Sequence, residues 1–230
     1  MWPSCPFIFR LPVNDRRSYE SMGYFRTQKN IEIIDAHHEI RKTMEVLIKD
    51  LSDEEWVYWC IDDRYPIDIR DPEYLSDLIE YLDSNELDLN GIKLFHWREE
   101  IIKNKHRKIL DRDYHLQSPY SIWGFWQHHF CKTKVLKSIF FSPKLPNPYR
   151  IRDINETFHL KKLYIPVMEK TLVPDDNNIL FREPCFQGKL TANGLDDLKR
   201  NQCPVPPYQK VDIRVEFRDR NTDAFKKEKK

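Results

Sequence analysis

Short apolar runs and stretches of helical periodicity alternate along the first hundred residues. Residues 6–12 and 56–61 are compact apolar runs bounded by proline or acidic residues, which is typical of buried strands. Between them, apolar residues recur at helical spacing from Ile40 to Leu51. A helix is therefore expected over residues 36–51, with Asp35 as its N-cap.

A second helix and a further strand follow. Asp71-Pro72-Glu73 combines a capping acid, a proline for the first helical position and an acid for the first turn, so a helix is expected from there to about Asp83. Residues 91–96 return as a strand. The strand at 56–61, this helix and this strand form a crossover unit, which predicts a parallel pair of strands. The expected fold class is α/β, with a mostly parallel sheet flanked by helices.

The C-terminal half is less regular. Residues 97–116 are strongly charged and yield no assignment, while short strands are expected over residues 163–168, 179–182 and 211–217. No internal repeat or domain boundary is visible, so residues 1–218 are expected to form a single domain. Residues 219–230 are mostly charged and are expected to form a disordered tail.

Composition narrows the functional classes. The 38 basic and 37 acidic residues give a net charge of +1, so no global field favours nucleic acid as a partner. The 5 glycines form neither a dinucleotide-binding nor a P-loop motif. No apolar run approaches the roughly 20 residues of a transmembrane helix. The 5 cysteines are scattered without metal-type spacing, which is typical of buried thiols in a reducing compartment. A soluble, cytoplasmic protein is expected.

The most informative polar residues follow the apolar run 56–61. Asp62 and Asp63 lie where a strand ends, and ligands of parallel α/β sheets bind beyond the carboxyl ends of the strands. Two carboxylates there are suited to Mg²⁺ or Mn²⁺, which would neutralise a diphosphate, and Arg64 is suited to a bidentate phosphate contact. The alternative is that the acid pair only ends the strand and solvates a turn.

The segment "WVYWCIDDRYP", residues 56–66, resembles the strand and DXD-like motif of GT-A-type glycosyltransferases, in particular bacterial and viral sugar-transferase families. Weaker similarity covers residues 2–14, 39–51, 121–137 and 188–195. The resemblance implies a GT-A-like fold, a nucleotide-sugar donor, Mn²⁺ or Mg²⁺, and glycosyl transfer to an acceptor hydroxyl of a surface glycan or polysaccharide. It implies Asp63 as a metal ligand, with Asp62 serving the metal and facing the ribose or sugar of the donor.

The same resemblance assigns further roles. Trp123 and Trp126 lie in its aromatic acceptor-side segment and would shape the acceptor site, although core anchoring is the alternative for both. An inverting transferase needs a general base after this segment, and the nearest acids are Asp153 and Glu156, because Arg152 stands where an acid is expected. In the family, the first strand holds the nucleotide, whereas residues 2–14 of this chain resemble the second strand. The resemblance therefore implies that the first strand of the fold is missing from this sequence.

Two other functional classes remain open. A GT-A-like fold without its first strand suits a non-catalytic glycan-binding or interaction protein. A metal-dependent nuclease built on Asp62, Asp63 and Glu99 is the other rival, and the near-neutral charge counts against it. A basic cluster at residues 98–108 is compatible with a phosphate-bearing donor, an acceptor or a lipid surface, or with a solvated face. The adjacent pairs His37-His38 and His128-His129 are interpreted as surface or packing residues.

Overall fold

The structure is a computed structural model, and its description covers residues 7–13, 29–60, 65–84, 87–96, 101–120, 122, 125–144, 154, 157–158, 162–182, 185–186, 189–200 and 202. For residues 65–68, 180–182, 185–186 and 189 it covers the backbone alone. The expected strand at 211–217 and the expected tail at 219–230 lie outside the described residues. No helix of the described part is long and apolar enough to cross a membrane.

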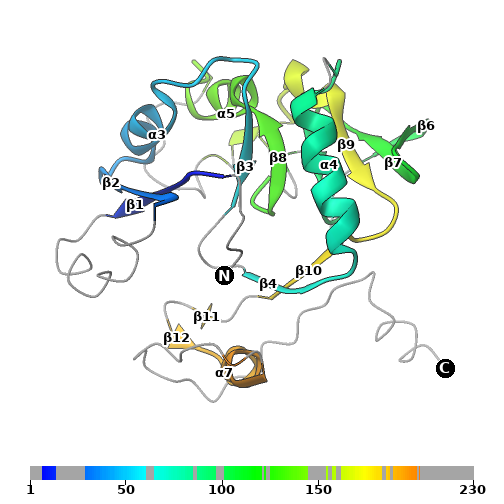
Figure 1. Ribbon diagram of the computed structural model, residues 1–230. Coiled ribbons are helices and arrows are strands. Elements are labelled where there is room, and N and C mark those ends of the chain that lie inside the picture. The colour runs from blue at the N-terminus through cyan, green and yellow to red at the C-terminus, as the bar shows by residue number, and fades with distance from the viewer. Residues whose placement is uncertain are drawn as a thin grey trace.

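A six-stranded mixed sheet forms the centre of the fold (Figure 1). Its strands occur in the order β3, β8, β5, β9, β7, β6. Their bounds are Trp56–Trp59 for β3, His129–Lys132 for β8, Gly91–Lys93 for β5, Thr171–Pro174 for β9, Arg112–Gln117 for β7 and Ile101–Ile109 for β6. Strands β5 and β9 pair in parallel, and the other four pairings are antiparallel. The chain is therefore α/β in class, with a mixed sheet.

Strands β3 and β5 were expected to pair in parallel, but they are not neighbours in the sheet. Both strands run in the same direction, but β8 lies between them and is antiparallel to each. The first three residues of β8, His129–Cys131, are buried. A position inside the sheet, with a paired strand on each side, removes these residues from water. The sheet is accordingly mixed, where the sequence predicted one that is mostly parallel.

Helices cover both faces of the sheet. Helix α4, Pro72–Ser84, lies across one face in Figure 1, and its apolar side chains share a core cluster with Ile92 of β5 and Phe130 of β8. Helices α3, Ile40–Ile48, and α5, Thr133–Phe140, share the other core cluster with Cys131. Because Phe130 and Cys131 are adjacent in one strand, they point to opposite faces, and so the two clusters lie on opposite faces of the sheet.

The predicted start of α4 is confirmed, and that of α3 is corrected. Asp71 caps α4, since its Oδ1 accepts the backbone N–H of Tyr74 at 3.0 Å, and Pro72 occupies the first helical position. Asp35 was expected to cap α3, but it is the last residue of strand β2, Ile31–Asp35. Helix α3 begins at Ile40 after Glu39, which makes no side-chain capping bond.

Strand β1, Phe9–Val13, confirms the apolar run near the N-terminus as a strand and pairs in parallel with β2. Arg10 ties this pair to α3. Its guanidinium makes two hydrogen bonds to the Asp50 carboxylate, at 2.7 and 2.6 Å, and one to the backbone carbonyl of Leu47 at 2.5 Å. The β1–β2 pair is a separate two-stranded sheet beside α3.

The remaining elements, apart from β4, lie in the second half of the chain. Strand β10, Ile179–Arg182, confirms the expected strand there and pairs with β4, Tyr65–Ile69. Residues 163–168 do not form the expected strand, because the 3-10 helix η2, Pro166–Lys170, begins within them at a proline suited to a first helical turn. A short hairpin and a last helix follow: β11, Cys185–Phe186, β12, Lys189–Leu190, and α7, Ala192–Arg200.

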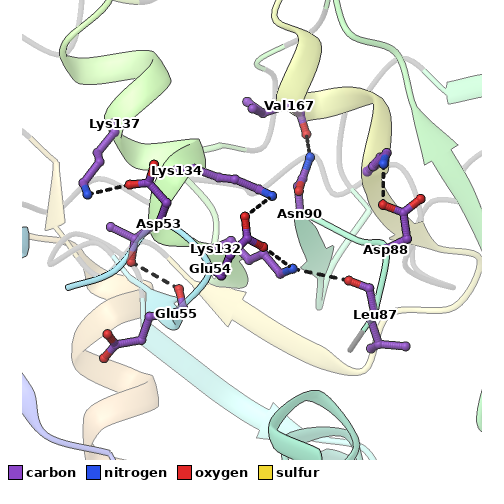
Figure 2. A network of polar contacts seen from close by, with 12 residues as sticks. Asp53, Glu54, Glu55, Leu87, Asp88, Asn90, Lys132, Lys134, Lys137 and Val167 are labelled. Carbon is purple, nitrogen blue, oxygen red and sulfur yellow. Dashed lines mark hydrogen bonds and ion pairs between the residues drawn. The ribbon is translucent and has the colours of Figure 1, made fainter. Parts of the chain in front are cut away.

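Ion pairs close the edge of the sheet where β3 and β5 begin and β8 ends (Figure 2). The Glu54 carboxylate accepts hydrogen bonds from the ammonium groups of Lys132 and Lys134, each at 2.7 Å. Asp53 accepts one from Lys137 at 2.6 Å. These partners are largely exposed acids paired with lysines of β8 and α5, so this edge serves to anchor the loop before β3.

Candidate functional site

The opposite edge of the sheet gathers the carboxyl ends of three strands. Strands β3 and β5 are both antiparallel to β8, and β9 is parallel to β5, so all three end at the same edge. Strand β8 begins there with His129. Ligands of open α/β sheets bind beyond such carboxyl ends, which makes this edge the candidate functional site.

A row of one half-buried and two buried side chains crosses the sheet at this edge. Trp59 of β3 pairs with His129 of β8, and His129 pairs with Lys93 of β5. Residues paired across neighbouring strands project to the same face, so the three side chains lie side by side. His129 is 1% exposed and Lys93 is 0% exposed. The Lys93 ammonium nitrogen lies 5.9 Å from the ring centroid of Phe125, which also contacts Trp59 and His129.

The surroundings of this row determine the protonation states of its titratable groups. Nδ1 of His129 lies 2.7 Å from the backbone carbonyl oxygen of Gln127, which can only accept, so Nδ1 carries the proton and Nε2 the lone pair. Burial, together with the nearby Lys93 ammonium, holds the pKa of His129 well below its usual range, so its ring is neutral at pH 7. Burial likewise raises the pKa of the Cys131 thiol to about 12.

A tyrosine–histidine pair occupies the other face of the same edge. The Tyr58 hydroxyl oxygen lies 2.8 Å from Nδ1 of His128, and His128 is 5% exposed. The Tyr58 ring stacks on Phe7 with a centroid distance of 5.9 Å and contacts Phe130 at 5.2 Å. A hydroxyl hydrogen-bonded to an imidazole can pass or accept a proton, and the surrounding rings shield the pair from water.

Two buried asparagines hold the segments that follow the strands. The Asn177 side-chain oxygen accepts the backbone N–H of His96 at 2.7 Å. The backbone of Asn178 bonds to Leu94 after β5 and to Arg70 before α4, at 3.0 and 3.1 Å. These contacts fix the position of the chain beyond β5 relative to α4. In the sequence, the two asparagines are marked only as part of the polar run Asp175-Asp176-Asn177-Asn178.

A cavity of about 450 Å³ runs between β1 and β3 and reaches Cys60, the last described residue before Asp62 and Asp63. It touches every residue from Phe7 to Pro12 and from Glu55 to Cys60. Successive side chains of a strand point to opposite faces, so a cavity in contact with all of them follows the backbone edges of both strands. Apolar residues of α3 and α5 complete the lining: Met44, Leu47, Ile48, Leu51 and Leu136.

Most of the predicted site residues lie in parts of the chain that the structure does not describe. The acid pair Asp62-Asp63 with Arg64, the base candidates Asp153 and Glu156, and the acceptor-side Trp123 all lie outside the described residues. For these residues the metal, base and acceptor roles stay predictions.

Trp126 is the predicted site residue that the structure does place. It is half-buried, and its ring centroid lies 6.3 Å from Trp59, 4.9 Å from Phe125 and 6.1 Å from Phe140. Its ring packs against the core cluster that includes α3 and α5. Trp126 therefore contributes to core packing and also lies next to the last residue of β3.

Sequence reasoning missed the buried polar residues of this edge. His128 and His129 were interpreted as surface or packing residues, and the structure buries both beside aromatic rings and Lys93. Lys93 was read only as part of a strand. A lysine inside the apolar run Gly91–Phe95 was an available signal, because lysine is rarely buried without a specific environment.

Two groups of described residues bring together side chains that could ligate a metal: His37, His38 and Glu39, and His106, His115 and Asp175. The second group adjoins the carboxyl edge at Asp175, which directly follows β9. Comparisons with known proteins supply no family, since no protein-family model, no curated protein and no solved structure matches the chain.

Proposed function

We propose that the chain is a metal-dependent glycosyltransferase that moves a sugar from a nucleotide-sugar donor to an acceptor hydroxyl. The observation that carries the proposal is the contact between Trp126 and Trp59. It brings the segment expected to bind the acceptor to the end of the strand from which the chain continues to Asp62 and Asp63. The mixed sheet with helices on both faces is interpreted as the core of a GT-A-type fold.

The proposed chemistry is displacement at the anomeric carbon of the donor. The acceptor oxygen forms a bond to that carbon, the bond from the carbon to the diphosphate oxygen breaks, and the acceptor proton passes to Asp153 or Glu156. Asp62 and Asp63 would hold Mn²⁺ or Mg²⁺, and the metal would supply positive charge to the diphosphate leaving group. Arg64 adds a bidentate contact to a phosphate oxygen pair.

The described residues support the proposal by the environment that they create. The carboxyl edge carries the Tyr58–His128 pair, a hydroxyl hydrogen-bonded to an imidazole, which is a group of the kind that orients or deprotonates hydroxyls. Titratable groups with strongly shifted pKa values gather at functional sites, although structural networks shift them too. The half-buried Trp126 lies on the Trp59 side of this edge, where an aromatic face can stack on a sugar.

Calorimetric titration of the full chain tests the proposal. Nucleoside diphosphates with different bases are titrated with and without Mn²⁺, into the wild type, Asp63→Ala and the matched control Asp77→Ala. Asp77 is an exposed acid on α4 and lies outside the candidate site. We expect metal-dependent binding of one nucleotide that is lost in Asp63→Ala and kept in Asp77→Ala.

Other outcomes overturn the assignment. If no nucleotide binds to a folded chain, glycosyl transfer by this chain is rejected. Binding of glycans with no dependence on nucleotide or metal would instead favour a non-catalytic glycan-binding protein on the same fold. Salt-dependent binding of DNA without nucleotide binding would favour the nuclease alternative.

A further inference from the structure

The far edge of the central sheet holds a second polar cluster, away from the carboxyl ends of β3 and β5. His106 of β6 pairs directly with His115 of β7, and their ring centroids are 4.2 Å apart. His115 Nε2 contacts the Asp175 carboxylate, and Asp175 follows β9 directly. One ligand atom of each residue lies within 4.8 Å of the other two. Three neighbouring strands therefore deliver two imidazoles and one carboxylate to one place.

We propose that His106, His115 and Asp175 form a site for a transition-metal dication of the Zn²⁺ type. Tetrahedral zinc binds histidine nitrogen and carboxylate oxygen at about 2.0–2.2 Å, and three protein ligands leave one position for water. Imidazole ligands select zinc over the hard cations that an all-carboxylate site prefers. The site is independent of the acid pair Asp62-Asp63 and of the proposed transferase activity.

The strands fix the directions of the ligands. His115 pairs on one side with His106 and on the other with Val173 of β9, so the three residues share one face of the sheet. Asp175 lies two residues after Val173, and its backbone N–H bonds to the Asp113 carbonyl oxygen at 3.2 Å, which keeps it beside β7. Ligands built on paired strands need little ordering when the metal binds.

The exposure of the ligand side chains and the hydrogen bonding of His115 also favour the binding of a cation. His106 is exposed and the Asp175 side chain is 41% exposed, so both can move the short distance that metal bonds require, while the His115 side chain is 18% exposed and held. Nδ1 of His115 is buried without a hydrogen-bond partner among the described residues. A metal at Nε2 therefore shifts the ring proton to Nδ1 without breaking another hydrogen bond.

The pairing next to the cluster balances its charge. Lys108 of β6 pairs with Asp113 of β7, so a base and an acid lie together on the same face as the two histidines. The neighbouring Arg107 pairs with the buried Tyr114 and projects to the opposite face. The carboxylate of Asp175 then remains to offset the charge of a bound dication.

The second group of candidate ligands serves as the matched control. His37, His38 and Glu39 are consecutive residues, and His37 Nδ1 already accepts the backbone N–H of Glu39 at 3.1 Å. The Glu39 carboxylate bonds to Lys42 at 3.2 Å. These atoms have local partners that a metal would have to displace, so this group is expected to stay without a metal.

The test uses the full chain and ZnCl₂ in calorimetry, followed by visible absorption with Co²⁺. We expect one zinc ion per chain. Affinity should fall at least tenfold in His106→Ala and in His115→Gln, and stay unchanged in the double variant His37→Ala/His38→Ala and in Asp77→Ala. The Co²⁺ spectrum should show the band of a tetrahedral or five-coordinate site without a thiolate charge-transfer band.

The exposed position of His106 makes His106→Ala the decisive variant, because its fold should be kept even if His115→Gln destabilises the chain. Circular dichroism and the unfolding midpoint without metal verify this. The proposal is overturned if His106→Ala binds zinc as the wild type does. It is equally overturned if the His37→Ala/His38→Ala control loses binding, or if cobalt reports cysteine ligands.

Discussion

Replacement of Leu78 by alanine tests the packing of α4 on the sheet. Leu78 is 0% exposed and belongs to the core cluster that contains Ile92 of β5 and Leu172 of β9. The substitution removes three buried carbons, which amounts to about 2.4 kcal/mol of transfer free energy at about 0.8 kcal/mol each. A residual cavity of about 50 Å³ adds about 1.2 kcal/mol, because the paired strands beneath cannot collapse into it.

The expected loss in the free energy of unfolding is therefore about 3.5 kcal/mol. Urea unfolding monitored by tryptophan fluorescence measures it. With a slope of about 2.5 kcal/mol per molar, the midpoint should fall by about 1.4 M. The control Val46→Ala lies on α3 at a position 37% exposed and should change the free energy by less than about 0.5 kcal/mol.

A loss below about 1 kcal/mol at an unchanged slope would refute the reasoning, since no fully buried leucine loses so little. Helix α4 would then not cover the β5–β9 region of the sheet. A changed slope would instead indicate a different denatured or native compactness, and the comparison would be repeated with Leu75→Ala on the same helix face.

Three further predictions concern the two edges of the sheet. Tyr58→Phe leaves Nδ1 of buried His128 without its hydroxyl partner and should lower stability by about 1–2 kcal/mol in urea unfolding, whereas unchanged stability would contradict the 2.8 Å hydrogen bond. The pKa of His129 is lower in the folded chain than in the unfolded chain, so below about pH 6.5 the unfolded chain binds more protons and the free energy of unfolding decreases as the pH falls. His129→Gln should reduce this pH dependence in urea unfolding midpoints measured from pH 6.5 to 5. Two lysines hold the pKa of Glu54 down to about 2, so its ion pairs contribute to the free energy of unfolding above pH 4.5 and this contribution disappears as the pH falls toward 2. Glu54→Gln should remove the pH dependence of stability in that range and leave the dependence due to His129 unaltered.

The features that the sequence predicted correctly depend on local signals. Helix α4 is specified by the cap Asp71, by Pro72 at the first helical position and by the apolar spacing that follows. Strands β3 and β10 are short apolar or aromatic runs whose type can be read within a few residues. Such signals require no knowledge of what packs against the element.

The features that the sequence could not supply depend on contacts between distant residues. The insertion of β8 between β3 and β5 depends on a strand some 40 residues further along the chain, and no local pattern encodes that order. The same pairing explains the burial of His129, because its neighbours Trp59 and Lys93 come from two other strands. Asp35 was misread as a cap because an acid before an apolar stretch suits a strand end as well as a helix start.

The two edges of the sheet treat charge in opposite ways, and this difference bears on function. At the edge where β3 and β5 begin, the exposed acids Asp53 and Glu54 form ion pairs with lysines. These charges stabilise the local structure and remain solvated. At the carboxyl edge, Lys93 and His129 are both buried, and burial disfavours the charged form of the His129 ring. Titratable groups with shifted pKa values gather at functional sites, and His129 adjoins β3, the strand that leads to Asp62 and Asp63. The carboxyl edge is therefore where ligand binding should first be sought.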